Sequence, residues 1–186
     1  MRVLITGGAG FIAFHLAAEL MRRGIEISLL DNFNDFYDPE IKRRNVRDLQ
    51  AMGPAPLHAV DILDCEGLRS AFERARPDTV VHLAAWAGVR PSLERPGLYA
   101  AVNVTGTAHV LETAREFSVR CFIFGSSSSV YGGSTRVPFT EDDPVDRPVS
   151  PYAATKRAGE LLCHTYARNY SMHITCLRFF TVYGPW

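Results

Sequence analysis

The sequence predicts an α/β fold in which a doubly wound parallel sheet carries helices on both faces. Short apolar runs alternate with helical patterns along all 186 residues, and this alternation is typical of parallel strands joined by right-handed crossovers. The apolar runs contain few polar residues, as expected of strands that are buried on both faces. Neither a long repeat nor a linker interrupts the pattern, so we expect one domain over residues 1–186.

The first half of the chain contains three expected strands. Val3–Thr6 is a short apolar run of the kind that forms a buried strand. A helix should follow, because apolar residues recur at spacing four until Gly24. The elements expected next are, in order, a strand over 25–30, a helix from Asp38–Pro39 to near Gly53, a strand over 57–60, and a helix that Asp64 caps and that ends near Ala75.

The second half of the chain continues the same alternation. The expected elements are, in order, a strand over 79–83, a loop with Pro91 and Pro96, a helix over 99–117, a strand over 120–124, a Pro- and Asp-rich loop, a helix from Ser150–Pro151 to near Tyr170, and a strand over 174–179. Ligands bind at the carboxyl ends of the strands in such sheets. The polar and small residues expected along that edge are Asp31, Asp61, Ala84, Ser126–Ser129 and Thr181.

Composition excludes several classes of function. Twenty acidic residues balance 20 basic ones, so the charge does not favour binding to nucleic acid or to an anionic membrane surface. No apolar run reaches the length of a membrane span, and an expected strand at the very start leaves no room for a signal peptide. We therefore expect a soluble, cytoplasmic protein.

The cysteines and histidines do not predict a metal site. The four cysteines are widely spaced without a C-x-x-C motif, which favours buried free thiols over disulfides. The six histidines lack the spacing of metal ligands. His82 lies on an expected buried strand, where a hydrogen-bonded core histidine is the simplest interpretation.

A glycine-rich turn predicts a dinucleotide site. Gly7-x-x-Gly10-x-x-Ala13 joins an expected strand to an expected helix, so its backbone can approach a pyrophosphate at the helix N-terminus. Asp31 ends the next strand, where a carboxylate accepts hydrogen bonds from the adenosine ribose and repels a 2′-phosphate. This favours NAD over NADP. Asp61 and Ile62 end the third strand and either contact the adenine or form an ordinary turn.

Tyr152 and Lys156 form a candidate acid/base pair. Ser150 and Pro151 suit the start of a helix, so residues 152 and 156 lie on one helical face. An ammonium beside a phenol lowers the phenol pKa and makes it a usable catalyst near neutral pH. Lys42 and Lys156 are the two lysines among 20 lysine and arginine residues, which argues against generic surface charge. The competing interpretation is an incidental pair on an amphipathic helix.

Five stretches together resemble the extended short-chain dehydrogenase/reductase superfamily, the NAD-dependent epimerases and dehydratases. They are Thr6–Ile12, His82–Ala85, Asn103–Thr107, Ser126–Gly132 and Tyr152-x-x-x-Lys156. Within this superfamily the chain is most similar to the UDP-glucuronate 4-epimerases. Three stretches carry that similarity, namely Ala87–Glu94, Leu177–Trp186 and again Ser126–Gly132.

The resemblance implies a Rossmann-like domain that binds NAD and supports redox 4-epimerisation of a UDP-sugar. Tyr152, Lys156 and Ser127 match the catalytic residues of the family, with Ser127 bonding to the reacting oxygen. The positions that match cofactor-binding residues are Gly7, Gly10, Phe11, Ile12, Asp31, Asn32, Asp61, Ile62, Leu83, Ala84, Ala85, Asn103, Tyr152 and Lys156. A homodimer through helices over 99–117 and 152–170 is also implied.

The residues after Ser127 bear on the substrate. Decarboxylases and dehydratases of the superfamily carry an acidic residue there, whereas this chain has Ser128 and Ser129. Hydroxyls can hold a sugar carboxylate that a neighbouring acid repels. The resemblance therefore implies a UDP-hexuronic acid substrate, held by Arg90, Ser128, Ser129 and Thr181. The alternatives are a surface role for Arg90, local backbone bonding by the serines, a UDP-hexose 4-epimerase, and a UDP-glucuronate decarboxylase.

Two departures from the family pattern stand out. Trp86 occupies the position of a usual Gln beside the expected nicotinamide pocket, and Ala13 replaces a usual Gly. The sequence also stops before the Gly-x-Arg-Pro-Asp-Met continuation and the C-terminal substrate domain of the family. We therefore expect a truncated NAD-binding domain over residues 1–186, and a non-catalytic NAD-binding fragment is a further alternative.

Overall fold

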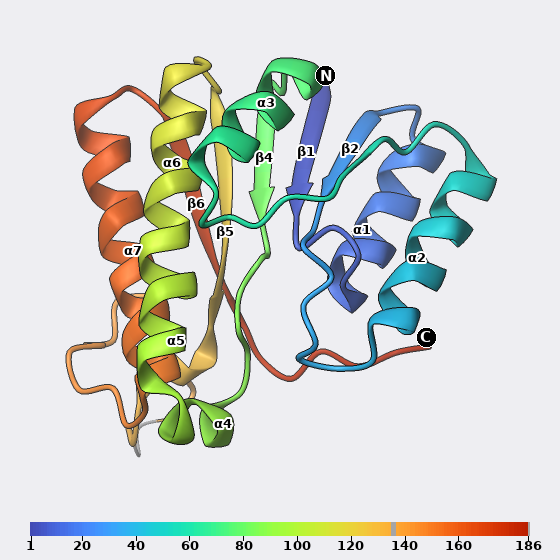
Figure 1. The fold of residues 1–186 in the computed structure, drawn as a ribbon. Helices are drawn as coiled ribbons and strands as arrows, with labels where there is room; N and C mark the ends of the chain where they lie inside the picture. The colour runs from blue at the N-terminus through green and yellow to red at the C-terminus, as the bar shows by residue number, and fades with distance from the viewer. Residues whose placement is uncertain (135–136, 186) are drawn as a thin grey trace.

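The computed structural model describes residues 1–134 and 137–185. Within these residues six parallel strands form one sheet in the order β3-β2-β1-β4-β5-β6, which confirms the predicted doubly wound fold (Figure 1). The strands are β1 (Arg2–Thr6), β2 (Glu26–Leu30), β3 (Leu57–His58), β4 (Thr79–His82), β5 (Cys121–Ser127) and β6 (His173–Phe179). The order reverses between β1 and β4, the position at which ligands bind in such sheets.

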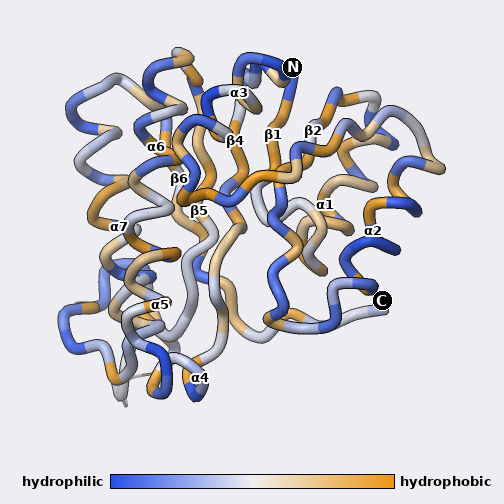
Figure 2. Tube along the Cα trace, in the orientation of Figure 1, coloured by the Kyte–Doolittle hydropathy of each residue, from blue (hydrophilic) through white to orange (hydrophobic). Residues whose placement is uncertain are grey.

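Helices cover both faces of the sheet (Figure 1). One layer is α1 (Phe11–Arg22) with α2 (Pro39–Met52), and the other is α3 (Cys65–Ala75), α6 (Thr107–Glu116) and α7 (Pro151–Asn169). Alternate residues of β1 serve the two layers, because Leu4 packs with α3 and α6 whereas Val3 and Ile5 pack with α1 and α2. Figure 2 shows the hydrophobic colour concentrated along the strands between these layers.

Side-chain caps begin three of these helices. The Asp38 carboxylate accepts a hydrogen bond of 2.9 Å from the Glu40 amide at the start of α2. Asp64 does the same for Gly67 in α3 at 3.0 Å, and Ser150 for Ala153 in α7 at 3.1 Å. These bonds satisfy backbone amides that a helix leaves unpaired. The predicted caps at Asp64 and Ser150 are confirmed.

The region between β4 and β5 differs from the prediction. The expected loop with two prolines is helical, as α4 (Val89–Glu94) and α5 (Pro96–Ala100), because a proline in the first helical turn removes an amide that is unpaired anyway. The expected helix over 99–117 is divided by a π-helical turn, η1 (Ala101–Gly106), before α6. The prediction of one regular helix was wrong because periodicity does not register a single wider turn.

Two strand boundaries also differ from the prediction. β3 ends at His58 because the chain turns at Asp61, whose carboxylate accepts a 2.8 Å bond from the Leu63 amide. β5 continues through Ser127 and leads into the 3₁₀ turn η2 (Ser128–Tyr131). The four cysteines are free as predicted, but only Cys163 is buried, since Cys65 is exposed and Cys121 and Cys176 are half-buried. In the described part of the chain, no helix has the length and apolar composition required to cross a membrane.

Candidate active site

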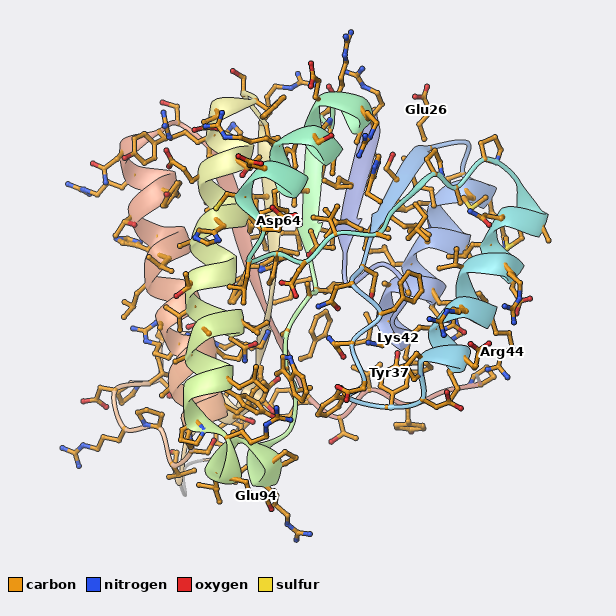
Figure 3. The ribbon with its side chains drawn as sticks, in the orientation of Figure 1. Glu26, Tyr37, Lys42, Arg44, Asp64 and Glu94 are labelled. Carbon is orange, nitrogen blue, oxygen red and sulfur yellow. The ribbon has the colours of Figure 1, made fainter. Side chains whose placement is uncertain are left out.

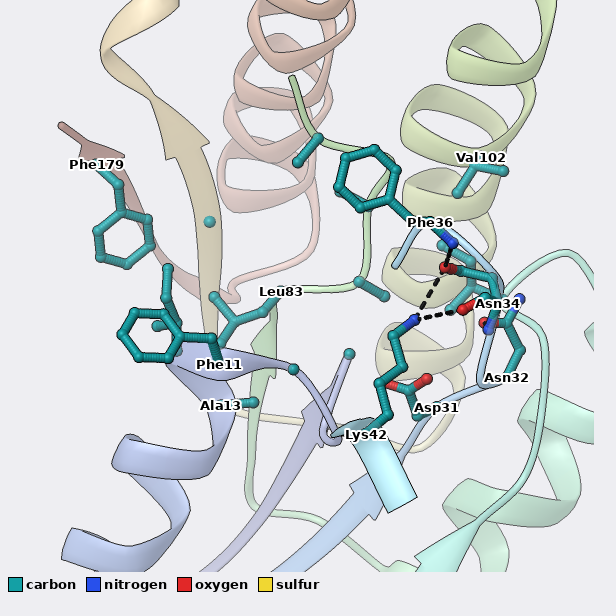
Figure 4. A pocket seen from close by; sticks show the side chains of 18 of the residues that line it. Phe11, Ala13, Asp31, Asn32, Asn34, Phe36, Lys42, Leu83, Val102 and Phe179 are labelled. Atoms are coloured by element: carbon teal, nitrogen blue, oxygen red, sulfur yellow. Dashed lines mark hydrogen bonds between the residues drawn. The ribbon is translucent and has the colours of Figure 1, made fainter. Parts of the chain in front are cut away.

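A cavity of about 380 Å³ lies at the carboxyl edge of the sheet, across the position where the strand order reverses. Residues from the ends of β1, β2, β4 and β5 and from the start of α7 line it (Figure 4). The predicted site residues in its wall are Gly7, Gly10, Phe11, Ile12, Asp31, Asn32, Asp61, Ile62, Leu83, Ala84, Ala85, Ser127, Tyr152 and Lys156. The fold therefore brings both ends of the predicted dinucleotide site into one cavity.

Gly7 shows why the loop between β1 and α1 needs a glycine. Its φ of +66° lies in the left-handed region, and a Cβ there would approach the Ala84 amide nitrogen to 2.8 Å. Both the backbone angle and the contact exclude an ordinary side chain. Gly10 then precedes α1, whose first residues Phe11 and Ile12 line the cavity. The free amides of this helix N-terminus consequently face the cavity, where they suit a pyrophosphate.

Asp31 links the glycine loop to the end of β2. The carboxylate is 6% exposed and accepts hydrogen bonds from the Ala9 amide at 3.1 Å and the Phe33 amide at 2.8 Å. Asp61 forms the turn after β3 and also accepts a 2.8 Å bond from the Asn32 amide group. Asp61 therefore forms the expected turn and also lines the cavity, while its contact with the adenine stays a prediction.

The segment after β2 supplies wall residues that sequence reasoning missed, namely Asn34, Phe36, Tyr37 and Lys42. Lys42 donates to the carbonyl and side-chain oxygens of Asn34, both at 2.9 Å (Figure 4), and lies 4.9 Å from the centre of the Tyr37 ring (Figure 3). Burial lowers the pKa of Lys42. The signal available in the sequence was the scarcity of lysine, since Lys42 is one of two.

Tyr152, Ser127 and Lys156 meet at the other end of the cavity. The Ser127 hydroxyl lies near the Tyr152 phenol, and both side chains line the cavity. The Lys156 ammonium lies 5.9 Å from the centre of the Tyr152 ring and donates a 2.7 Å bond to the Gly125 carbonyl. These contacts are possible because β5 ends at Ser127 beside the first two turns of α7. The arrangement presents a phenol and a hydroxyl to one point in the cavity, with a cation behind them.

The expected effect of Lys156 on Tyr152 is corrected by the structure. Burial raises the pKa of Tyr152, and the Ser127 hydroxyl opposes that rise only in part. The Lys156 ammonium is directed at the Gly125 carbonyl, and its own burial lowers its pKa to about 8. Removal of both groups from water therefore outweighs their mutual attraction in this structure.

Five predicted site residues lie outside the cavity wall, namely Arg90, Asn103, Ser128, Ser129 and Thr181. Arg90 and Thr181 are exposed. Ser129 accepts a 3.1 Å bond from the Ser127 hydroxyl, so it lies directly behind a predicted catalytic group. Asn103 is buried, and its amide group bonds to both the backbone nitrogen and the carbonyl of Trp86, at 2.8 and 2.9 Å.

His82 connects the glycine loop to the helical layer through a buried chain of hydrogen bonds. The Thr107 hydroxyl donates to the Asn103 carbonyl at 2.6 Å, so it must accept the 3.0 Å bond from Nε2–H of His82. The Thr6 hydroxyl accepts from the Ala84 amide at 3.3 Å and donates to Nδ1 at 2.6 Å. The neutral Nε2–H tautomer satisfies every bond, as predicted for a core histidine.

The residues present fit a bound dinucleotide. The cavity combines a close-approach glycine loop, a helix N-terminus and a strand-end carboxylate. In addition, the Tyr37 hydroxyl and the Asn45 amide oxygen are buried with no hydrogen-bond partner in the described part of the chain. Tyr37 lines the cavity, so an incoming ribose hydroxyl or phosphate can supply its missing partner.

Comparisons with known proteins agree with this geometry. The chain is 48% identical to UDP-glucuronate 4-epimerase 4 of Arabidopsis thaliana over 185 residues, which are 99% of this chain and 42% of that protein. The structure of UDP-glucuronic acid 4-epimerase from Bacillus cereus, in complex with UDP-glucuronic acid and NAD, superposes with a TM-score of 0.90 at 36% identity and covers 100% of this chain and 58% of its own. The UDP-glucose 4-epimerase of Thermus thermophilus in complex with NAD gives a TM-score of 0.87 at 39% identity, with coverages of 100% and 57%.

The chain thus spans about half the length of the relatives that it matches. A model of the NAD dependent epimerase/dehydratase family matches residues 3–186. The match includes the glycine loop, Asp31 and the Tyr152–Lys156 pair, so NAD is the cofactor that the family places in this cavity. The chain belongs to the NAD dependent epimerase/dehydratase family.

Proposed function

We propose that residues 1–186 are the NAD-binding portion of a nucleotide-sugar 4-epimerase that interconverts UDP-glucuronate and UDP-galacturonate. The observation that carries the proposal is the meeting of Ser127 and Tyr152 at one end of the NAD cavity, with Lys156 behind them. The relatives named above, UDP-glucuronate 4-epimerases among them, support the reaction class.

In the proposed reaction Tyr152 transfers the proton, while Ser127 and Lys156 position the sugar and the cofactor. Bound NAD supplies a hydride acceptor and donor at the sugar C4. Tyr152 removes the proton of the C4 hydroxyl and returns it after the keto sugar has turned over. Ser127 bonds to the same oxygen, and the Lys156 ammonium holds the nicotinamide ribose. Because NAD is regenerated in each cycle, it stays bound.

The groups around Ser127 support a uronic acid substrate. A 4-keto uronic acid is a β-keto acid and loses CO₂ readily, so an epimerase must not assist that loss. Ser128 and Ser129 follow Ser127, and neither carries an acid. Glu160 approaches the neighbouring Ser126 at 2.7 Å but also binds Arg178 at 2.9 Å, which neutralises it. Hydroxyls from Ser128, Ser129 and Thr181, together with Arg90, are the proposed contacts of the carboxylate.

A UDP-hexose 4-epimerase is the second candidate. The similarity to the UDP-glucose 4-epimerase of Thermus thermophilus, 39% identical over this chain, favours it. For either substrate, the cavity wall lacks some contacts to the UDP-sugar. We propose that these contacts come from a region equivalent to the part of the relatives that this chain does not span. We further propose that the protein acts in the cytoplasm as a homodimer, formed through the stretch from α5 to α6 together with α7. Sedimentation of the NAD-bound protein tests the dimer.

The reaction is tested on a full-length form that contains this chain. Incubation with UDP-glucuronate should yield UDP-galacturonate, with little UDP-xylose or 4-keto-pentose in the product mixture. UDP-xylose as the main product would reject the epimerase in favour of a decarboxylase. Equal turnover of UDP-glucose and UDP-glucuronate would favour the second candidate. The 186-residue chain is assayed in parallel, and turnover there would reject the idea of a non-catalytic NAD-binding fragment.

A further inference from the structure

An uninterrupted series of aromatic rings runs from the cofactor wall to the catalytic tyrosine. The Phe36 and Trp86 rings meet edge to face, with centroids 5.5 Å apart. The Trp86 ring lies 6.2 Å from that of Tyr99, and the Tyr99 ring lies 6.2 Å from that of Tyr152. Such edge contacts are favourable beyond the area that they bury. The series therefore couples the segment after β2 to the start of α7.

The Phe36–Trp86 contact crosses the cofactor cleft. Phe36 follows β2 and Trp86 follows β4, while β1 lies between these two strands in the sheet. The glycine loop with Gly7 continues from β1. Two rings that meet across this position join the two halves of the cleft above the loop. Phe36 lines the cavity (Figure 4), whereas Trp86 does not, so Trp86 contacts the cavity wall through Phe36.

Trp86 is held through both its backbone and its ring, whereas Phe36 is held through its backbone amide. Asn103 bonds to both backbone polar groups of Trp86. The Arg95 guanidinium lies 5.1 Å from the centre of the Trp86 ring. Phe36 is 38% exposed, and its amide donates to Asn34 in the same segment at 3.2 Å. Because Phe36 is exposed and Trp86 is half-buried, we expect the Phe36 side chain to move when the contact opens, with Trp86 as the fixed side.

We propose that Trp86 is a positioning residue that holds Phe36 across the cleft, so that the dinucleotide enters and leaves slowly. The contact between the two rings is named here the Phe36–Trp86 bridge. The inference rests on the proposed binding of NAD in this cavity and adds a kinetic role to it. An aromatic pair of this kind contributes enough free energy for about a three- to tenfold change in a rate.

The test is the kinetics of NADH binding to the 186-residue chain, followed by NADH fluorescence in a stopped-flow instrument. Trp86→Ala and Phe36→Ala should each speed both association and release by about three- to tenfold, with a much smaller change in Kd. The Phe36→Ala/Trp86→Ala double variant should be no faster than either single variant, because one contact is removed in all three. Trp86→Phe retains a ring and should restore most of the slow rates.

The control variant is Tyr183→Ala, which removes a ring that is 89% exposed and should leave both rates unchanged. Faster release with unchanged association would mean that the rings only contact the cofactor, and would overturn the bridge. Unchanged rates in Phe36→Ala, a replacement of a partly exposed side chain, would overturn it as well. A further outcome is that Trp86→Ala accelerates NADH binding while the full-length form shows no epimerase activity. That outcome supports the bridge and rejects the proposed reaction. No binding of NADH by the unaltered chain rejects both.

Discussion

The Lys156 ammonium donates a hydrogen bond of 2.7 Å to the carbonyl oxygen of Gly125. This bond joins α7 to β5. It lies directly behind Ser127 and Tyr152, which belong to the same two elements. Lys156 is 5% exposed, and its burial lowers its pKa to about 8. The catalytic end of the cavity therefore contains a buried cation that the fold tolerates at neutral pH at an energetic cost.

The pH dependence of stability should report the cost of burying Lys156. Its pKa is about 8 in the folded chain and 10.5 for an ordinary exposed lysine. Between these values the unfolded chain holds a proton that the folded chain has lost, so the free energy of unfolding should rise with pH by about 1.4 kcal/mol per unit. The measurement is chemical denaturation from pH 7 to 10.5, for the unaltered chain and for Lys156→Met. The free energy of unfolding of the unaltered chain, minus that of Lys156→Met, should increase above pH 8, and a difference that stays constant with pH would contradict the prediction.

Tyr152→Phe separates chemistry from cofactor binding. The substitution keeps the ring that packs against Tyr99 and removes the hydroxyl that lies near Ser127. In a full-length form we expect epimerisation to fall by about 10²- to 10⁴-fold, the usual contribution of a general acid/base, while NAD remains bound. Product analysis and the absorbance of retained NAD measure the two effects. Retained turnover would remove Tyr152 from its proposed role.

Gly7→Ala and Gly10→Ala should affect different properties. Gly7 has a φ of +66°, and a Cβ there would lie 2.8 Å from the Ala84 nitrogen, so the substitution should lower the free energy of unfolding by at least about 1–2 kcal/mol. At Gly10 a Cβ would meet only the Gly7 carbonyl, at 3.1 Å. Gly10→Ala should therefore fold nearly normally and bind NADH weakly, because its methyl group occupies the pyrophosphate approach. Thermal unfolding and NADH titration distinguish the two variants.

Glu160→Ala should be among the most destabilising substitutions of a charged residue. Glu160 is 6% exposed and accepts bonds from Arg178 at 2.9 and 3.1 Å. Its loss leaves a guanidinium with little solvent access, which costs about 3–5 kcal/mol. The matched control is Glu40→Ala, since the Glu40–Arg43 pair of 2.7 Å has side chains that are 64% and 51% exposed and should contribute less than about 1 kcal/mol. Equal effects in urea denaturation would contradict the assignment.

His82 should stay neutral throughout the physiological range. Burial, with the nearby Lys156 charge as a second cause, lowers its pKa to about 3 from the 6.5 of an ordinary exposed histidine. Nitrogen-15 NMR should show the Nε2–H tautomer with no titration between pH 5 and 8. Because the unfolded chain binds a proton between pH 6.5 and 3 that the folded chain does not, stability should fall as the pH drops through this window. A His82 signal that titrates near pH 6.5 would exclude the chain of hydrogen bonds described above.

Local sequence patterns predicted the elements that build the site. Strand runs, the Asp64 and Ser150 caps and the glycine loop all follow from interactions between residues a few positions apart. Local patterns did not predict three other features, namely the short helix α4, the π turn at Ala101–Gly106 and the length of β5. These features depend on the packing of the region between β4 and β5. Lys42 and Tyr37 were missed for the same reason, since their place beside the cavity arises from how α2 packs on α1.

By itself the sequence determined the class of the fold, the glycine loop with Asp31, and the common helical face of Tyr152 and Lys156. These features depend on the two- and 3.6-residue periods of strands and helices and on caps, which are written in neighbouring residues. Only the tertiary structure decided that Ser127 meets Tyr152, that Phe36 meets Trp86 across β1, and that burial raises the pKa of Tyr152. Such contacts join residues far apart in the chain, and such pKa shifts sum the desolvation from every surrounding element, so the order of the strands must be known first.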